Sequence, residues 1–238
     1  MINEAIILAG GFGTRLKKVV KGVPKPMVNI NERPFLEYLL NYLIEQGIEK
    51  VILAVGFKFD VIQRYFKNQY KKLTLEYSVE KEPLGTGGAI KKALKLTKTE
   101  SIFIFNGDTF FNIDLSKLYK FHRLKNTDLT IALKIKKNTN RFGSIDVDAE
   151  NRIVHFEEKQ PKKSGFINGG TYIINKGLFE KLNLVEKFSF EKDLLEKYYK
   201  DNNFYGLPFD KFFIDIGIPK DYEKVKKEFK KMVRSIGI

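Results

Sequence analysis

A glycine-rich segment near the N-terminus has the residue types needed to bind phosphates. Residues 8–16 read LAGGFGTRL, and residues 24–26 read PKP. Glycines after a strand let the backbone approach a phosphate closely and present N–H groups that favour anions. Arg15 and Lys25 can then neutralise phosphate charge. The GxxxxGK[ST] pattern is absent, and Leu16 stands where a dinucleotide-binding pattern has its third glycine. The alternative is a glycine turn without a ligand. The presence of Arg15 and Lys25 near the glycines favours a phosphate-binding loop.

Two aspartates have the placement expected of magnesium ligands. Asp108 follows the apolar run SIFIFNG, and Asp215 ends the apolar run FFID. Mg²⁺ usually takes one or two carboxylates together with substrate phosphates, and ligands of parallel sheets bind beyond the carboxyl ends of the strands. Taken singly, each aspartate could instead be a helix N-cap or a turn residue. The pair predicts a Mg²⁺ site that also holds a nucleotide phosphate.

The elements that must position these residues alternate along the first half of the chain. Apolar runs predict strands at 4–8, 50–55, 73–79 and 101–105, and helical spacing of apolar residues predicts helices at 33–46, 61–66 and 85–96. This alternation is typical of a parallel sheet that is covered on both faces and has right-handed crossovers. The fold class is therefore α/β, with a mostly parallel central sheet flanked by helices.

The second half is richer in strands and mixed in direction. After a helix at 115–124, further elements are expected as strands at 129–135, 143–147, 152–156, 170–174 and 212–216, and as helices at 188–199 and 220–233. No Pro/Ser-rich linker or repeat separates the halves. We expect one domain over residues 1–238, with a nucleotide-binding lobe at 1–125 and a lobe for a second substrate at 126–238. The apolar face of the last helix suits its own core and, less well, a homodimer contact.

Composition excludes several classes of protein. The 238 residues are 43% hydrophobic and 30% charged, which is typical of a globular chain. The absence of cysteine excludes disulfides and thiolate chemistry and fits a reducing cytoplasm. No segment resembles a signal peptide or a membrane span. The net charge of +14 comes from scattered lysines without a nucleic-acid-binding motif, so we expect no nucleic-acid or membrane partner. His122 and His155 lack partners at useful spacing, which indicates structural roles.

The motifs together resemble those of the sugar-1-phosphate nucleotidyltransferase family. Matches run in order along nearly the whole chain: LAGGFGTRL and PKP, then Glu80 with EPLGTGGAI, NGDTFF, FGSIDVD, FEEK, INGGTYI and FIDIGIPKDY. The resemblance implies a Rossmann-like nucleotide-diphospho-sugar transferase fold and the reaction of an NTP with a sugar 1-phosphate. NGDTFFNIDLSKL and KFSFEKDLLEKYYK most resemble members that use GTP and a heptose 1-phosphate. The implied cofactor is Mg²⁺, and the implied product serves capsule, lipopolysaccharide or S-layer glycan synthesis.

The resemblance also assigns roles to individual residues. Arg15 would bind the β- and γ-phosphates, Lys25 the α-phosphate, and Asp108 and Asp215 the metal. The residues assigned to the nucleotide are Leu8, Ala9, Gly10, Gly11, Gly13, Thr14, Glu80, Gly85 and Thr86. Those assigned to the sugar phosphate are Gly143, Glu158, Lys159, Asn168 and Gly169.

Each assigned residue has a plainer interpretation. Glu80 could accept hydrogen bonds from guanine N1–H and its amine, or it could be an exposed charge at a strand end. Gly85 and Thr86 could simply start a helix, Lys159 could be one more solvated lysine, and the glycines of the second half could be turns.

Other functions remain open on sequence alone. The same fold could transfer GMP to mannose 1-phosphate, or it could transfer a uridylyl or cytidylyl group. A nucleotide-sensing subunit without turnover is disfavoured because Gly13, Arg15, Lys25, Asp108 and Asp215 are all present. A nucleic-acid binder would have a strongly salt-dependent affinity that is indifferent to Mg²⁺ and GTP.

Overall fold

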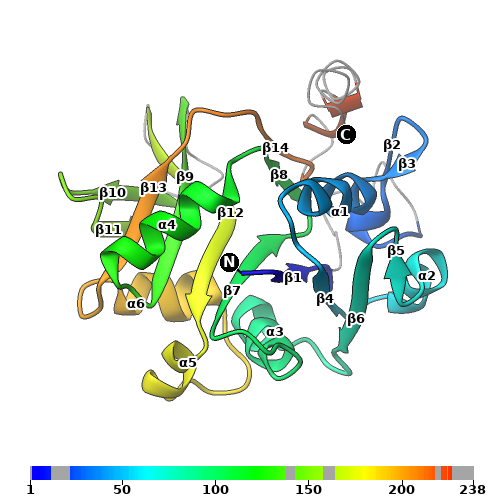
Figure 1. The fold of residues 1–238 in the computed structure, drawn as a ribbon, viewed down its shortest axis with the longest axis horizontal. Helices are drawn as coiled ribbons and strands as arrows, with labels where there is room; N and C mark the ends of the chain where they lie inside the picture. Colours follow the sequence, from blue (N-terminus) through cyan, green and yellow to red (C-terminus); the bar gives the residue numbers. More distant parts are fainter. Residues whose placement is uncertain are drawn as a thin grey trace.

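The computed structural model describes residues 2–11, 22–137, 143–157, 164–217, 221–223 and 225–226. Within them, ten strands form one sheet (Figure 1). Its order is β11 (Ile153–Glu157), β10 (Ser144–Val147), β12 (Ser164–Asn175), β7 (Ser101–Asn106), β1 (Glu4–Leu8), β4 (Lys50–Val55), β6 (Leu73–Val79) and β5 (Gln69–Tyr70), while β9 (Leu129–Lys137) pairs with β12, and β13 (Phe204–Pro208) with β9. Two small sheets pair β14 (Phe213–Asp215) with β8 (Thr109–Phe111), and β2 (Asn29–Ile30) with β3 (Arg33–Pro34).

The parallel part of the sheet is the one that the sequence predicts. Strands β7, β1, β4 and β6 are parallel neighbours, and each has residues buried on both faces. Strand β12 then runs antiparallel to β7, β9 and β10, and β13 pairs with β9 in parallel. The α/β fold class with a mostly parallel core and a mixed second half is confirmed.

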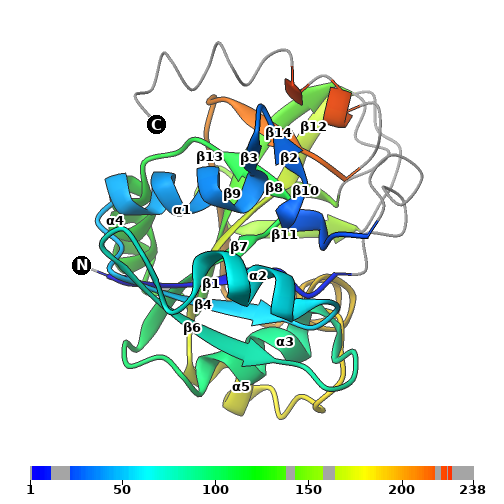
Figure 2. The same ribbon diagram turned by 90° about the vertical axis from the view of Figure 1, so that its right-hand side faces the viewer.

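Helices cover both faces of this sheet (Figures 1 and 2). Helices α1 (Phe35–Glu45), α2 (Phe59–Phe66) and α4 (Leu115–Lys125) bury side chains in the core of one face. Helix α3 (Gly85–Leu94), α5 (Gly177–Lys181) and a π-helical turn, η2 (Phe190–Leu195), do so on the other face. Two short elements complete the list: a 3₁₀ turn, η1 (Lys25–Met27), and α6 (Glu196–Tyr198). No helix in these described ranges is long and apolar enough to cross a membrane.

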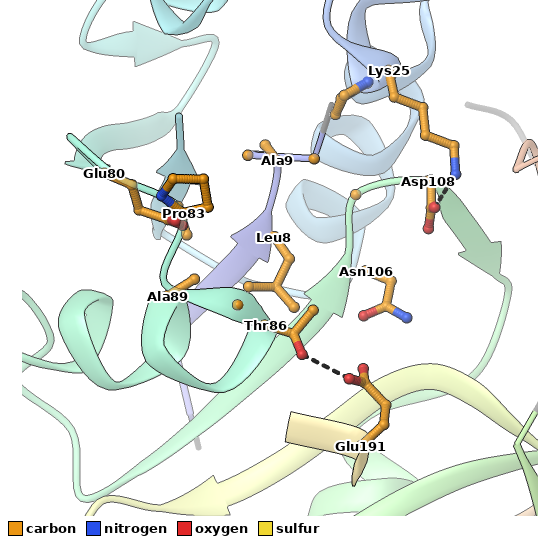
Figure 3. Close-up of a pocket in the computed structure, with 16 residues that line it drawn as sticks. Leu8, Ala9, Lys25, Glu80, Pro83, Thr86, Ala89, Asn106, Asp108 and Glu191 are labelled. Carbon is orange, nitrogen blue, oxygen red and sulfur yellow. Dashed lines mark hydrogen bonds and ion pairs between the residues drawn. The ribbon is translucent and has the colours of Figure 1, made fainter. Parts of the chain in front are cut away.

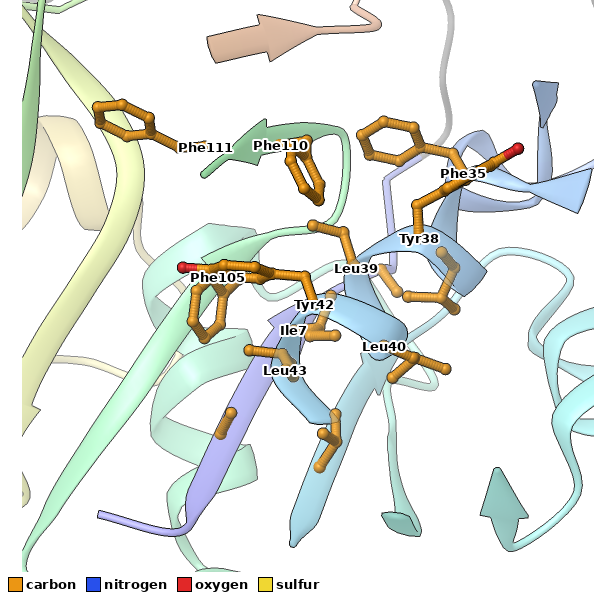
Figure 4. Close-up of a cluster of buried hydrophobic side chains, with 14 of the residues drawn as sticks. Ile7, Phe35, Tyr38, Leu39, Leu40, Tyr42, Leu43, Phe105, Phe110 and Phe111 are labelled. Carbon is orange, nitrogen blue, oxygen red and sulfur yellow. The ribbon is translucent and has the colours of Figure 1, made fainter. Parts of the chain in front are cut away.

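Alternating side chains of the central strands divide the core into two layers. Ile7 and Phe105 point to the α1 layer, whereas Ile6 and Ile104 lie in the layer that contains α3. Figure 4 shows the first of these layers, in which Tyr42 packs edge-on against Phe105 with 6.5 Å between the ring centroids. Burying a side chain of this size stabilises a fold by about 1.5–3 kcal/mol. Because the central strands are buried on both faces, the sheet is held in place, and so are the strand ends at which the candidate site lies.

Short elements differ from the expectations. The helix expected at 188–199 is the turn η2 followed by α6, and β2, β3, β5, β8, β13 and α5 are not predicted at all. Most of these are two to five residues long, too short for an apolar period to appear. Of the helix expected at 220–233, residues 221–223 and 225–226 are described and are helical.

Candidate active site

A cavity of about 330 Å³ opens at the carboxyl ends of β1 and β7 (Figure 3). The two strands are parallel neighbours, and Leu8 pairs with Asn106. Gly107 N then donates a hydrogen bond to Leu8 O at 3.0 Å. A Cβ at Gly107 would lie 2.4 Å from Leu8 O, so only glycine lets the two strand ends meet. The lining residues are Leu8, Ala9, Gly10, Gly11, Lys25, Pro26, Ala54, Glu80, Pro83, Gly85, Thr86, Ala89, Asn106, Gly107, Asp108 and Glu191.

At one corner of the cavity a carboxylate is paired with an ammonium group, and a second carboxylate lies nearby. The Nζ of Lys25 forms an ion pair with Oδ2 of Asp108. Strand β14 pairs with β8, so Ile216 N donates to Asp108 O at 2.9 Å and Asp215 lies opposite Thr109. A Cβ at Gly217 would lie 2.7 Å from Oδ1 of Asp215 and 3.2 Å from Nζ of Lys25. Asp108, Asp215 and Lys25 therefore lie close together, although they are far apart in the sequence and Asp215 does not itself line the cavity.

This corner fits a divalent cation that is shared with a ligand. In the described part of the chain, no group of three or more His, Cys, Asp or Glu residues could hold a metal ion. Mg²⁺ commonly takes only one or two carboxylates and completes its shell with phosphate oxygens and water. The Lys25 ammonium shows that the corner accepts a positive charge. Asp108 and Asp215 have the right chemistry for that ion.

The opposite end of the cavity contains a half-buried carboxylate, that of Glu80. Its Oε2 accepts a hydrogen bond from Leu84 N at 2.9 Å. Burial raises the pKa of Glu80, while the Leu84 hydrogen bond and the charge of Lys92 oppose that rise. A Cβ at Gly10 would lie 3.4 Å from Glu80 Oε1 and 3.3 Å from Gly56 N. Glycine at position 10 keeps this end of the cavity open.

The first turn of α3 is glycine-rich because another segment packs on it. Gly87 N and Gly88 N both donate to Phe188 O, at 3.0 and 3.3 Å. A Cβ at Gly87 would lie 2.1 Å from the Phe188 ring, and one at Gly85 would lie 2.5 Å from Phe188 O. Gly85 also has a φ of +75°, which favours glycine. Thr86 between them lines the cavity.

Part of the expected sugar-phosphate site is also brought together. Asn168 N donates to Gly143 O at 3.0 Å, and a Cβ at Gly169 would lie 2.5 Å from Ala132 O. These three residues do not line the cavity of Figure 3. Among the other expected residues, those that lie outside the described residues are Gly13, Thr14, Arg15, Glu158 and Lys159.

The sequence reasoning did not assign several lining residues. Asn106 and Gly107 belong to the NGD motif, of which only the aspartate was given a role. Glu191 lies in the run KFSFEKDLLEKYYK, where charge and spacing gave no signal for a site. Of the two histidines, His122 is buried between Thr130 and Asn175, which fits the structural role expected of it.

Comparisons with known proteins agree with this geometry. The family model described as "Nucleotidyl transferase" matches residues 4–232. The chain is 51% identical to D-glycero-alpha-D-manno-heptose 1-phosphate guanylyltransferase of Aneurinibacillus thermoaerophilus, over 94% of this chain and 97% of that protein. It is 50% identical to the enzyme of the same name from Campylobacter jejuni, over 92% of this chain and 96% of that protein.

A solved structure shows the same arrangement of the chain. HddC from Yersinia pseudotuberculosis, complexed with GMP-PN, superposes with a TM-score of 0.85 at 39% identity, covering 96% of this chain and 100% of that one. The family model matches nearly the whole chain, and two relatives are about 50% identical to it in sequence. The chain belongs to the nucleotidyl transferase family.

Proposed function

We propose that this nucleotidyltransferase joins GTP and D-glycero-alpha-D-manno-heptose 1-phosphate into the GDP-sugar with release of pyrophosphate. The observation that carries the proposal is the identity of 51% and 50% to two enzymes of that name over nearly their full lengths. The reaction needs a nucleotide and a second phosphate ester side by side, and the cavity joins the end that contains Glu80 to a corner that accepts a positive charge. Because GTP is available in the cytoplasm, the proposal also implies a cytoplasmic reaction.

The sugar phosphate would act as its own nucleophile. One of its phosphate oxygens attacks the α-phosphorus, a new P–O bond forms, and the bond to the bridging oxygen breaks as pyrophosphate leaves. The second pKa of a phosphate monoester is about 6, so no strong general base is needed. In such transfers the protein mainly positions the reactants and neutralises charge.

The charged corner would supply that neutralisation. We assign Asp108 and Asp215 to the metal ion, which members of the family generally use and which we take to be Mg²⁺. When bound, Mg²⁺ would neutralise phosphate charge there. Lys25 would release Asp108 and hold the α-phosphate, since its ammonium and the metal compete for the same carboxylate. Arg15 would hold the β- and γ-phosphates as pyrophosphate departs.

The remaining assignments concern recognition. Glu80 would accept hydrogen bonds from guanine N1–H and the exocyclic amine, since an ionised carboxylate only accepts. The nucleotide would lie along residues 8–11 and against Gly85 and Thr86, with Gly13 and Thr14 completing the phosphate loop. Lys159 would bind the sugar phosphate, and the sugar would contact Gly143, Glu158, Asn168 and Gly169. One continuous sheet supports a single domain with two lobes, and a homodimer remains a proposal.

A substrate panel tests the proposal. GTP, ATP, UTP and CTP are each paired with heptose 1-phosphate, mannose 1-phosphate and glucose 1-phosphate, and pyrophosphate release is measured. GTP with heptose 1-phosphate should give the highest kcat/KM. A higher value for any other pair would contradict the proposed substrates while leaving the reaction class intact.

A further inference from the structure

Glu191 is a cavity carboxylate to which the proposed mechanism gives no role. It lines the cavity, yet it comes from the turn η2 in the second half of the chain and not from the ends of β1 and β7. It is half-buried. A carboxylate in this position is costly to bury unless it has partners, so its surroundings indicate its use.

One oxygen of Glu191 is fixed by hydroxyl groups. Oε2 accepts from Thr86 Oγ1 at 2.6 Å and from Ser189 Oγ at 3.1 Å. The Thr86 hydroxyl in turn accepts from Phe190 N at 2.9 Å. Because Phe190 N donates to it, the hydroxyl must direct its own proton to Glu191. This orients Glu191 rigidly and leaves Oε1 without a hydrogen-bond partner among the described residues.

The backbone around Glu191 is held just as firmly. Phe188 N donates to Leu84 O at 3.0 Å, and Phe188 O accepts from Gly87 N and Gly88 N, so both backbone groups of Phe188 are bonded to this part of the chain. Ser189 caps η2 by accepting from Lys192 N at 3.2 Å. The glycines of α3 are therefore needed to seat the segment that delivers Glu191 to the cavity.

The position of Glu191 selects the kind of group it can bind. Phosphates are excluded because they share its negative charge, and a carboxylate needs a hydrogen-bond donor. In Figure 3, Glu80 marks the base end, and Lys25 with Asp108 marks the phosphate corner. A nucleotide that joins these two would pass Ala9, whereas Glu191 lies off that path, beyond Thr86 and on the side of Asn106.

Asn106 connects this side to the expected sugar residues. A Cβ at Gly170 would lie 2.9 Å from Nδ2 of Asn106, so the two residues are in contact. Gly170 N donates to Asn168 Oδ1 at 3.0 Å. Asn106 and Gly170 therefore connect this side of the cavity to Asn168, which we assign to the sugar.

We propose that Glu191 is a specificity-determining residue that accepts a hydrogen bond from a hydroxyl of the sugar 1-phosphate, with Thr86 as its positioning residue. The inference rests on the proposed function, since it names what the second substrate must present. A sugar with a hydroxyl at this point is bound, and one that lacks it leaves the carboxylate unpaired, which costs affinity.

The substitution E191Q tests this with little change in shape. Because Thr86 must still donate, the amide oxygen would face Thr86 and the amide nitrogen, a donor, would face the cavity. The KM for the sugar phosphate should rise about tenfold or more, while the KM for GTP stays within about twofold of wild type. The control E186Q alters an exposed carboxylate of the same segment and should leave both constants unchanged.

Thr86 provides the second comparison. T86V removes the hydroxyl and should raise the KM for the sugar phosphate in the same direction, and T86S, which keeps a hydroxyl, should restore it. A rise in the KM for GTP alone, or unchanged constants in E191Q, would overturn the inference. The wild-type enzyme in the same assay tests the function separately. If the wild-type enzyme prefers another sugar phosphate, the proposed substrate is wrong. The KM of E191Q is then compared with that of wild type for the preferred sugar phosphate.

Discussion

Three carboxylates line the cavity and a fourth, Asp215, lies beside it, and the four form two pairs that differ in what surrounds them. Asp108 and Asp215 flank the ammonium of Lys25, whereas Glu80 and Glu191 are each held through one oxygen by neutral donors. The first pair can exchange its cation for a metal ion and a phosphate. The second pair is placed to accept hydrogen bonds from a ligand. We propose that the same functional group serves charge neutralisation in one place and recognition in the other, according to its neighbours.

The largest expected effect follows from removing a charge of the first pair. D108N should lower kcat by about a thousandfold, because several kcal/mol of charge stabilisation would be lost and each 1.4 kcal/mol is about tenfold. Steady-state kinetics across a Mg²⁺ titration measure it. D210N, at a carboxylate with a side chain that is 91% exposed, is the control and should behave as wild type. A kcat of D108N within tenfold of the wild-type value would contradict the proposed role of the first pair in neutralising charge.

A change in the second pair should alter selection and not the rate of chemistry. E80Q should lower the preference for GTP over ITP, which lacks the exocyclic amine, by about tenfold or more. The ratio of kcat/KM for the two nucleotides gives the answer. E82Q, an exposed carboxylate two residues away, should leave the ratio unchanged. An unaltered ratio in E80Q would place base recognition elsewhere.

The packing that carries Glu191 can be tested through stability. A Cβ at Gly88 would lie 2.2 Å from Glu186 O and 2.8 Å from Leu84 Cβ. G88A should therefore lower the free energy of unfolding by about 1–3 kcal/mol, as measured by chemical denaturation. Gly177 has no atom within 4 Å of such a Cβ, so G177A should cost nothing. Equal stability of the two variants would show that this segment is not fixed on α3.

The smallest effect concerns an ionisable group outside the cavity. Burial lowers the pKa of His122, so the unfolded chain binds its proton more tightly than the folded one does. Stability is then fully present above the unfolded pKa of about 6.5 and falls as pH drops through the folded value. The Tm should decrease by a few degrees on acidification below that point, and H122Q should flatten this dependence.

Much of the frame was predictable from the sequence because its signals are local. Strand β1 with Gly10 and Gly11, and strand β7 with Asp108, are each an apolar run that ends in a polar loop. Parallel pairing of such runs places their ends together, so the cavity follows from the pattern. Glu80 was assigned differently, because the motif around it resembles a base-contacting segment of the family.

The other contacts depend on residues that are distant in the sequence. Asp215 is brought close to Asp108 by the pairing of β14 with β8. The strand at 212–216 was expected from its apolar run, whereas β8 has three residues and leaves no periodic signal, so this pairing could not be predicted. Glu191 lies 105 positions from Thr86, in a π-helical turn where an ordinary helix was expected. The resemblance assigned Gly85 to the nucleotide, and the packing of Gly85 and Gly87 against Phe188 had no signal in the sequence.

The location of the metal ion tests the central claim most directly. Crystals of the protein with a non-hydrolysable GTP analogue and Mn²⁺ would give an anomalous signal for the ion. The account predicts a single peak within bonding distance of both Asp108 and Asp215, with Lys25 moved from Asp108 to the α-phosphate. A peak bound by neither aspartate, or a nucleotide bound with the Lys25–Asp108 pair intact, would contradict it.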